Sequence, residues 1–365
     1  MDANKVKKIL FLGASAFLLG GCSLGGGSTD PNITDASIFR SDDAGVTFEP
    51  KVTVDEKTNL TGVDVLSWEF HPTNPDIIYI GTLKSGMYRS ANKGDSWEKM
   101  YFPPEKAYGL AVDPTNGDQL YASGVFGNVS KLYSSQNAGS DWKEIYTEPG
   151  AGSVITALAI DPSNANHIFA ANSAGIVIES LDRGASWKNV KTFSGPVTQI
   201  TFVEKTPGTV LVLIQGKDIL VSRDNGVTWP ETNNGFVPGI NYNQTNTGDE
   251  TGVMPSNQNT ILVDQYIPGL LYTGTDTGLF RSFDYGVTWE SMNILESSKE
   301  FPIRAVAVNP INSQEIVYTA GSALYRTRDN GTNWSTTKLD INRPVRILKF
   351  DPRQSNTLYI ALKKQ

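Results

Sequence analysis

Short runs in which large apolar residues alternate with polar residues, separated by turn residues, fill the chain after residue 21. Residues 65–70 (Val-Leu-Ser-Trp-Glu-Phe) predict one strand, and residues 77–81 predict a second strand after a turn containing Pro and Asn. Residues 87–90 predict a third strand, and a fourth strand begins at Trp97. No long helical period follows residue 21, so the pattern predicts an all-β protein built from four-stranded antiparallel units.

An eight-residue phrase joins the third and fourth predicted strands and recurs seven times. It reads Ser/Thr-x-Asp/Asn-x-Gly-x-x-aromatic, and its closing aromatics are 49, 45, 45, 42, 60 and 45 residues apart. A period of about 40–50 residues indicates repeated supersecondary units. The acidic or amide residues at the third position are Asp43, Asn92, Asn137, Asp182, Asp224, Asp284 and Asp329.

The chemistry of this phrase suits a hairpin turn. Ser and Asp or Asn side chains accept hydrogen bonds from the N–H groups of their own turn, and Gly adopts positive φ at no steric cost. The closing aromatic is expected to pack between repeats. The alternative interpretation is a catalytic or calcium-binding carboxylate in each repeat. One carboxylate per turn has too few ligands for calcium, and the amides of Asn92 and Asn137 carry no charge. We therefore predict a structural role for all seven.

The two ends of the chain complement each other. Residues 37–40 predict a third strand with no first or second strand before it, whereas residues 345–350 and 358–362 predict a first and second strand with none after them. Together they complete one composite unit, which removes exposed sheet edges. We predict a seven-bladed β-propeller of four-stranded antiparallel blades over residues 37–365, closed by this composite blade.

The phrase resembles the Asp-box, also called the bacterial neuraminidase repeat. The resemblance covers residues 37–365 and extends to sialidases, two-propeller xyloglucanases, the luminal domain of sortilin and the photosystem II assembly-factor propellers. The usual assembly-factor repeat ends Asp-Gly-Gly-x-Thr-Trp, whereas this chain varies the middle residue. Turns of the form Asp-Pro-x-Asn-Pro look more like sortilin and the xyloglucanases. The resemblance implies a propeller, with either a binding role or glycoside hydrolysis.

The N-terminus predicts export and lipidation. Three lysines precede the apolar residues 9–19, which are too few to span a hydrocarbon core of about 30 Å. Residues 19–23 (Leu-Gly-Gly-Cys-Ser) resemble the bacterial lipobox, so we expect a signal peptide over residues 1–21, lipidation of Cys22 and a flexible tether over residues 22–36. The alternative is an ordinary cysteine in a conventional signal peptide. The prediction places the protein outside the cytoplasm on a membrane, the outer membrane if the organism has one.

Charge and histidine content limit the classes of partner. The net charge is −7, and no basic stretch interrupts the acidity after residue 21, so nucleic acid is not an expected partner. His71 and His167 lie two repeats apart, and the single cysteine lies in the lipobox. We predict no metal site and no cofactor.

Ligands are expected on the face opposite the repeated phrase, where the connections between blades lie. Residues 230–258 lengthen one such connection and include Phe236 and Tyr242. Loops of this length are typically functional or disordered, so the two interpretations are a binding loop and a mobile loop with no binding role. A second candidate is the connection with Tyr101 and Phe102, whose rings could stack on a sugar or pack over the blade edge.

The third candidate is the start of the first strands, at one equivalent position per blade. Those positions hold Leu66, Tyr108, Thr156, Thr198, Asn259, Arg304 and Arg346. Two adjacent blades supply arginines, and Arg343 lies nearby in sequence. Arginine binds carboxylates in bidentate fashion, but these arginines could equally pair with Glu296, Glu300 or Asp340.

We therefore predict a non-catalytic binding or assembly module for an envelope protein, peptide or glycan. The alternative is a sialidase-like or xyloglucanase-like glycoside hydrolase that uses the mouth of the channel. The Arg-Ile-Pro sequence usual near a sialidase N-terminus is missing, and no spaced pair of carboxylates can be assigned. The residues favour binding, and no catalytic residue is predicted.

Overall fold

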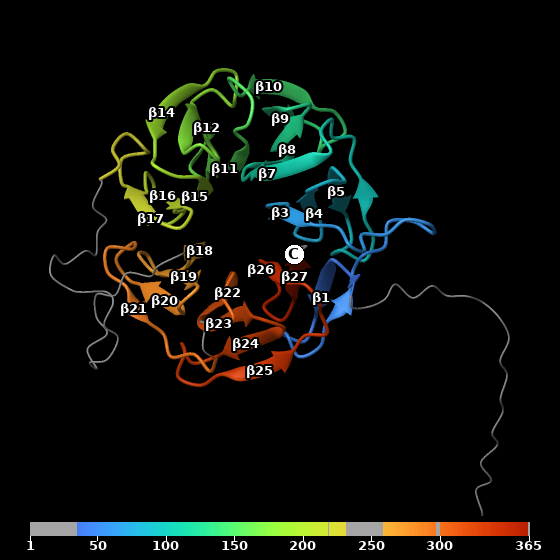
Figure 1. Cartoon of the computed structure of the whole chain (residues 1–365), viewed down its shortest axis with the longest axis vertical. Coiled ribbons are helices and arrows are strands. Elements are labelled where there is room, and N and C mark those ends of the chain that lie inside the picture. The colour runs from blue at the N-terminus through green and yellow to red at the C-terminus, as the bar shows by residue number, and fades with distance from the viewer. Residues whose placement is uncertain (1–34, 218, 231–257, 297–299, 364–365) are drawn as a thin grey trace, which may run out of the picture. The chain divides into compact units, whose positions relative to one another are not determined.

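The computed structural model describes residues 35–217, 219–230, 258–296 and 300–363. Seven sheets are arranged radially around a centre (Figure 1). Six of them have four antiparallel strands, and the sheet of β15, β16 and β17 has three among the described residues. The fourth strand of that blade is expected after Trp229, mostly beyond the described part. The prediction of a seven-bladed all-β propeller is confirmed.

Each blade begins at the centre and ends at the rim. The first strands are β3 (Val65–Phe70), β7 (Lys106–Asp113), β11 (Ile155–Asp161), β15 (Val197–Phe202), β18 (Gln258–Val263), β22 (Ala305–Asn309) and β26 (Val345–Phe350). The second strands are β4 (Ile78–Thr82), β8 (Asn116–Phe126), β12 (Asn164–Asn172), β16 (Val210–Ile214), β19 (Leu271–Thr275), β23 (Asn312–Ala320) and β27 (Leu358–Leu362).

The outer half of each blade contains shorter strands. The third strands are β1 (Ile38–Ser41), β5 (Met87–Ser90), β9 (Val129–Ser135), β13 (Ile176–Ser180), β17 (Ile219–Ser222), β20 (Leu279–Ser282) and β24 (Ala323–Thr327). The fourth strands are β2 (Glu49–Pro50), β6 (Glu98–Lys99), β10 (Lys143–Thr147), β14 (Lys188–Thr192), β21 (Glu290–Ser291) and β25 (Ser335–Lys338). The fourth strands carry exposed polar residues because they form the rim.

The core lies between blades, which explains the composition of the second strands. Every residue of β4, β16, β19 and β27 is buried. A strand that is covered on both faces by neighbouring sheets reads as a continuous apolar run rather than an alternating one. The first strands β3 and β11 are only partly buried, and β11 alternates between buried and half-buried residues.

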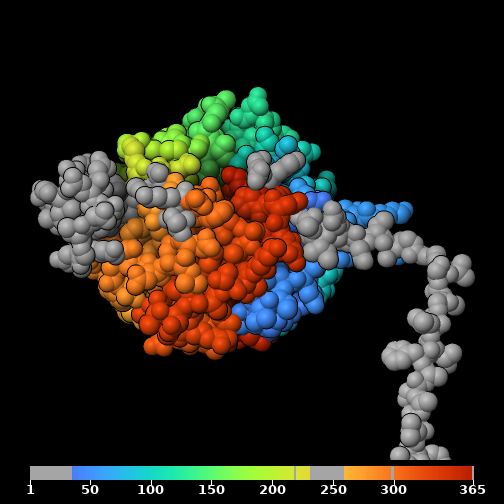
Figure 2. All heavy atoms as spheres, turned by 60° about the horizontal axis from the view of Figure 1, so that its bottom comes forward, coloured from blue at the N-terminus to red at the C-terminus, as the bar shows by residue number. Residues whose placement is uncertain are grey.

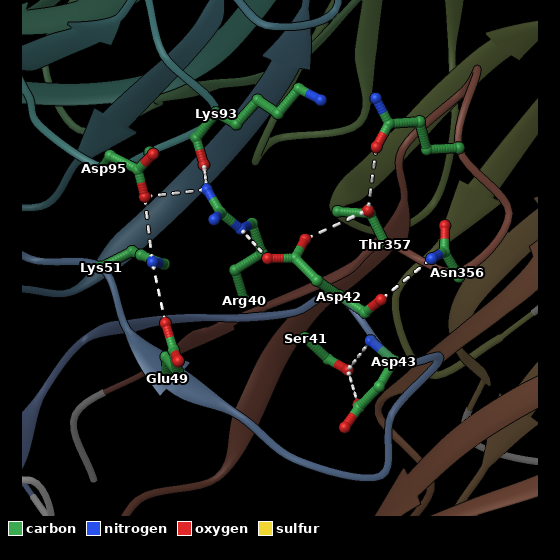
Figure 3. Close-up of polar contacts among 12 residues, drawn as sticks. Arg40, Ser41, Asp42, Asp43, Glu49, Lys51, Lys93, Asp95, Asn356 and Thr357 are labelled. Carbon is green, nitrogen blue, oxygen red and sulfur yellow. Dashed lines mark hydrogen bonds and ion pairs between the residues drawn. The ribbon is translucent and has the colours of Figure 1, made fainter.

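The composite blade closes the ring as predicted. Its strand order is β2-β1-β27-β26, with Ile38 opposite Ala361 and Ser41 opposite Leu358. Figure 2 shows the blue N-terminal atoms beside the red C-terminal atoms at this seam. The Nδ2 of Asn356 donates to the Asp42 carbonyl at 2.9 Å (Figure 3). Closure therefore joins residues about three hundred positions apart in sequence.

Polar contacts also tie the composite blade to the blade of β3–β6 (Figure 3). The Arg40 guanidinium donates to the Lys93 carbonyl at 2.9 Å and to Asp95 at 3.0 Å. Lys51 pairs with Asp95 at 2.9 Å, and its carbonyl accepts a hydrogen bond from the Trp97 indole at 2.9 Å. Trp97 therefore bonds to the preceding blade, in addition to the packing between blades that the sequence predicted for the closing aromatic.

The alternating strand directions define two faces of the disc. The seven phrases connect third to fourth strands; we call them clasps, and the face on which they lie the clasp face. They are residues 41–48, 90–97, 135–142, 180–187, 222–229, 282–289 and 327–334. The opposite face carries the starts of the first strands and the turns between second and third strands, and we call it the channel-mouth face. Among the described residues, no helix is long and apolar enough to cross a membrane.

Candidate functional site

Each clasp is closed by its own side chains, as the clasp of residues 222–229 illustrates. The Ser222 hydroxyl donates to Asp224 at 2.7 Å and accepts from the Gly226 N–H at 2.8 Å. The Asp224 carboxylate is the second acceptor of the turn, and it accepts a hydrogen bond from the Thr228 N–H at 2.8 Å. The Trp229 indole donates to the Gly226 carbonyl at 2.9 Å. The turn therefore satisfies its own backbone N–H groups.

The bond from the serine or threonine hydroxyl to the acidic or amide side chain recurs in all seven clasps, at Asp43, Asn92, Asn137, Asp182, Asp224, Asp284 and Asp329. The indole bond differs between clasps: Trp187 and Trp289 repeat it, whereas Trp97 and Trp334 donate to carbonyls of the preceding blade. In the amide clasps the spare N–H group finds a partner, since Asn92 donates to Ser96 at 2.9 Å. In the acidic clasps hydrogen bonds favour the charged form. The hydroxyl and N–H of Thr228 lower the pKa of Asp224 to about 2, and the N–H of Asn333 is the main cause of the same lowering at Asp329.

One clasp position was not predicted from the sequence. The residue before each clasp glycine adopts the left-handed conformation, with φ between 54° at Ala138 and 63° at Tyr285. Its carbonyl accepts a hydrogen bond from the preceding blade in four cases: Lys93 from Arg40, Asn330 from Arg281, Ala44 from Arg326, and Arg183 from the Tyr121 hydroxyl. The clasps thus make hydrogen bonds within and between blades. The acidic residues accept the bonds of their own turns, as expected for a structural role.

On the channel-mouth face, β-bulges set the equivalent position of the first strands. The register of the first strand shifts at Leu66, Tyr108, Thr156, Thr198, Asn259 and Arg346. In the seventh blade Arg304 lies immediately before β22. A bulge adds one residue and redirects its side chain away from the regular alternation. The ring of positions selected from the sequence is therefore a structural ring as well.

Two members of this ring hold neighbouring blades together. The Thr156 hydroxyl donates to the Val197 carbonyl at 2.6 Å, and the Asn259 amide donates to the Ile303 carbonyl at 3.1 Å. The acceptor in each case lies at or just before the start of the next blade's first strand. These side chains are part of the fold, so the variable and more accessible members are Thr198, Arg304 and Arg346.

A small pocket opens beside Arg304, between the blade of β22–β25 and the composite blade. Its volume is about 120 Å³, and its walls are Phe301, Pro302, Arg304, Thr319, Gly321, Pro344 and Val345. All of these residues belong to the channel-mouth face. Phe301 is 42% exposed, and its ring lies so close to Gly321 that a Cβ there would approach to 2.8 Å. The pocket combines apolar walls with one guanidinium and one hydroxyl.

The two predicted arginines differ in their surroundings. Arg304 is exposed and makes no hydrogen bond or ion pair within the part of the chain that the structure describes. Arg346 is accessible to solvent but is surrounded by protein, and this burial lowers its pKa, an effect that the negative charge of Asp64 opposes. Two positive charges from adjacent blades thus lie at the same level of the channel mouth.

Arg343 has a different role from the one proposed for it. Its guanidinium donates to the carbonyls of Asp35 at 2.9 Å, Ala36 at 3.0 Å and Val63 at 3.3 Å, and to the Ser37 hydroxyl at 3.1 Å. Burial lowers its pKa, while Asp64 and Asp35 oppose the shift. These bonds fasten the start of the N-terminal strand, so Arg343 is committed to ring closure rather than to a ligand.

The predicted aromatic candidates also separate. Tyr101 is 87% exposed, but Phe102 is only 8% exposed and packs edge-on against Tyr133 and Trp142. The expectation of an exposed pair therefore holds for Tyr101 alone, because Phe102 fills the space beneath the connection. Tyr108 lies on its bulge, half buried, and burial raises the pKa of its hydroxyl. Phe236, Tyr242 and Cys22 lie outside the described residues.

Acidic residues near the mouth are mostly bonded to the fold. Asp276 accepts a hydrogen bond from Asn259 at 3.2 Å, and Asp35 accepts one from Asn342 at 2.9 Å. Asp64 lies close enough to Arg346 for its negative charge to oppose the lowering of that guanidinium's pKa by burial. Within the described ranges, no group of three or more His, Cys, Asp or Glu side chains is placed to hold a metal ion. The recess beside Arg304 combines one guanidinium with apolar walls, while the carboxylates of Asp35, Asp64 and Asp276 lie near the mouth.

Comparison with known proteins places this arrangement in a family. The model of the Sortilin-Vps10 family, described as sortilin, neurotensin receptor 3, matches residues 130–268 and 277–365. The chain belongs to this family. The matched residues include the strands that form the pocket beside Arg304 and all of the C-terminal part of the composite blade.

Two curated relatives of this Sortilin-Vps10 chain are glycoside hydrolases by name. A xyloglucanase from a Paenibacillus species is 25% identical over 373 residues, covering 78% of this chain and 34% of the relative. A probable oligoxyloglucan-reducing end-specific xyloglucanase from Neosartorya fischeri is 25% identical over 219 residues, covering 55% of this chain and 25% of the relative. The chain therefore spans only about a third or a quarter of these relatives.

Solved structures confirm the propeller fold. The GH74 xyloglucanase of Xanthomonas campestris superimposes with a TM-score of 0.67 at 18% identity, covering 82% of this chain and 51% of that one. The YCF48 protein of Cyanidioschyzon merolae gives 0.56 at 14% identity, covering 82% and 95%. A structure of YCF48 bound to D1 peptide gives 0.59 at 14% identity, covering 86% and 98%. At these identities the likeness concerns the fold alone.

The pocket of this Sortilin-Vps10 propeller was not predicted, although a signal for it was present. The segments Pro302-Ile-Arg304 and Pro344-Val-Arg346 share the pattern Pro, β-branched residue, Arg immediately at the start of adjacent first strands. Proline fixes φ and lacks an N–H group, so it suits the residue just before a strand. The repeated pattern could have indicated two arginines held in the same way. The apolar walls of the pocket could not be predicted in this way, because they depend on how the two blades pack.

Proposed function

We propose that this protein is a lipid-anchored, extracytoplasmic binding module that recognises an anionic group of an envelope protein, peptide or glycan at the channel mouth. The observation that carries the proposal is the pair Arg304 and Arg346, which occupy equivalent positions in adjacent blades. Arg304 has no partner among the described residues and lines the pocket with Phe301. A guanidinium presents five N–H donors in a fork that matches a carboxylate.

The pocket walls add a second requirement on the ligand. Phe301, Pro302, Pro344 and Val345 offer apolar contacts beside the guanidinium, and Thr319 offers a hydroxyl. The recess that these residues line has a volume of about 120 Å³. We expect the pocket to take an acidic group with a short apolar neighbour, while Tyr101 contacts a more distant part of the ligand.

Crosslinking and affinity capture of the native lipoprotein test the proposal. Arg304→Ala combined with Arg346→Ala should lower recovery of the specific partners at least tenfold. The matched control is Arg328→Ala with Lys143→Ala, which removes the same charge from exposed residues on and beside the clasps. Equal loss in both double variants would indicate a general charge effect and would contradict the arginine site. A parallel deletion of residues 231–258 tests whether that connection contributes.

The second candidate function is xyloglucan hydrolysis, which the two curated relatives favour. A glycosidase needs two carboxyl groups about 5–5.5 Å apart for retention or about 6.5–9.5 Å apart for inversion. Among the acids near the mouth, Asp35 and Asp276 are each bonded to an amide of the fold, and Asp64 lies near Arg343 and Arg346. We expect no release of reducing ends from xyloglucan. Release that disappears in an Asp276→Asn variant would establish the hydrolase instead.

The anchor is tested separately. Cys22→Ala should abolish acylation and release the protein from membranes, because the lipid chains supply the hydrophobic free energy of association, roughly 0.8 kcal/mol per buried methylene. Partitioning of this variant into the detergent phase would contradict the lipobox interpretation.

A further inference from the structure

The described chain begins at a residue that is held firmly in place. The Asp35 carbonyl accepts hydrogen bonds from the Gly62 N–H at 3.0 Å and from Arg343 at 2.9 Å. Its carboxylate accepts a bond from the Asn342 amide at 2.9 Å. The next two residues, Ala36 and Ser37, are buried and also receive bonds from Arg343. Any tether that precedes Asp35 therefore joins the propeller at a defined point.

That point lies at the edge of the channel mouth. The residues that hold Asp35 belong to the segments immediately before β3 and β26, the two first strands on either side of the seam. Figure 1 shows β26 and β3 near the centre of the ring, and β1 lies farther out in the blade of β26. The negative charge of Asp64 opposes the lowering of the pKa by burial at both Arg343 and Arg346, so the attachment point and Arg346 lie near the same carboxylate.

We propose that the channel-mouth face is turned toward the membrane, and that its ligand is a membrane-proximal loop or tail of an integral membrane protein. This inference rests on the proposed lipid anchor at Cys22. Twelve residues lie between Cys22 and Asp35. A flexible chain of that length has an end-to-end distance of about 20 Å and reaches at most about 45 Å.

The length of the tether favours this orientation over its reverse. A strand of six residues gives the disc a depth of about 20 Å. To face the membrane with its clasps, the protein would need a tether that first crosses from the mouth to the rim and then passes the full depth of the disc. A tether that follows this longer path has fewer conformations available to it than one that leads directly from the mouth to the membrane.

Charge supports the same orientation. The clasp face carries the carboxylates of Asp43, Asp182, Asp224, Asp284 and Asp329, whose lowered pKa values keep them ionised. An anionic lipid surface repels such a face, whereas Arg304 and Arg346 lie on the opposite one. The ligand reached by those arginines then lies within the span of the tether from the membrane.

Fluorescence quenching on vesicles tests the orientation. The lipidated protein offers no free thiol, because the only cysteine is Cys22. One fluorophore is placed at Phe126→Cys, at the turn between β8 and β9 on the channel-mouth face, or at Val227→Cys in a clasp; these positions are 57% and 78% exposed. Vesicles of phosphatidylethanolamine and phosphatidylglycerol carry a quencher on the lipid headgroup. We expect at least twofold stronger quenching at position 126. Equal quenching, or stronger quenching at position 227, would overturn the orientation.

Two further variants separate this inference from the proposed anchor. With Cys22→Ala, both labelled proteins should fail to bind vesicles; binding that persists would contradict the anchor, not the orientation. Thirty Gly and Ser residues inserted after Ser23 should reduce the contrast between the two positions, because a longer tether lets either face approach. A contrast that survives the insertion would show that the tether does not set the orientation.

Photo-crosslinking in cells tests the partner class. A photoreactive residue at position 126 should capture proteins that resist carbonate extraction, whereas the same residue at position 227 should not. Capture of soluble proteins or glycan alone from position 126 would overturn the assignment to an integral membrane protein. Loss of the membrane-protein crosslinks in the Arg304→Ala/Arg346→Ala background would link them to the proposed binding site.

Discussion

The two faces of this propeller differ in how far the repeats resemble each other. On the clasp face, seven copies of one phrase make the same hydrogen bonds, and even the carbonyls of the strained residues are used between blades. On the channel-mouth face, seven equivalent positions carry seven side chains, of which Thr156 and Asn259 hold blades together and Arg304 does not. Repetition therefore marks the parts of the chain that build the fold, and divergence marks the parts available to a ligand.

The largest effect should come from filling the space at a clasp glycine. A Cβ on Gly226, where φ is 81°, would lie 2.5 Å from Phe169 of the preceding blade. Gly226→Ala should therefore lower the free energy of unfolding by about 2–4 kcal/mol in urea denaturation. Gly127→Ala is the matched control, since φ is 63° there and no atom lies within 4 Å. It should cost only about 1 kcal/mol, and equal losses would mean that the clasp does not depend on close packing.

A comparison of two arginines that the sequence grouped together should give the next largest effect. Arg343→Ala removes the bonds to Asp35, Ala36 and Ser37 and should lower the free energy of unfolding by about 1.5–3 kcal/mol. Arg304→Ala should change it by less than about 0.5 kcal/mol while weakening ligand capture. Thermal denaturation of both variants measures the difference. A stability loss at Arg304 as large as that at Arg343 would remove the distinction between closure and binding.

Acid should weaken the clasp face first. Hydrogen bonds in the turns lower the pKa of Asp182 and Asp224 to about 2, below the ordinary value of 3.8. Their contribution to stability is therefore complete above about pH 4 and is lost as the pH falls toward 2. Urea midpoints measured across this range should fall steeply. Asp182→Asn with Asp224→Asn should make the fall shallower, as in the natural amide clasps at Asn92 and Asn137; an unchanged slope would place the acid sensitivity elsewhere.

The smallest effect should come from relieving the strained residue of a clasp. Ala138 has φ of 54°, which costs an alanine about 1 kcal/mol but costs glycine nothing. Ala138→Gly should therefore be neutral or stabilising by less than about 1 kcal/mol, because the greater freedom of the unfolded chain offsets part of the gain. Ala185→Gly, at an exposed clasp position whose φ is not positive, should be destabilising instead. Differential scanning calorimetry compares the two; parallel losses would contradict the strain argument.

The repeat made much of the architecture predictable. The phrase predicted the hairpins, the strand patterns predicted β3 and β27 nearly to the residue, and the incomplete ends predicted the pairing of β1 with β27. The left-handed residue before each clasp glycine was missed, because Ala, Lys, Arg, Asn and Tyr share no side-chain property that indicates positive φ. The packing of Phe102 over the blade edge was one of two predicted alternatives, and contacts with Tyr133 and Trp142 decided it. The use of Arg343 was missed because its partners come from the other end of the chain.

The sequence by itself determined the number of blades, the hairpin in each blade and the composite closure, because these depend on local hydrogen bonds and on a period that the chain displays. It also selected the equivalent positions at the starts of the first strands. Only the tertiary structure decided what those positions do. Bulges aim the side chains, and contacts between blades consume Arg343, Thr156 and Asn259 while leaving Arg304 beside a pocket. An arginine has the same chemistry in every case, and the neighbours supplied by distant residues determine whether its donors are satisfied.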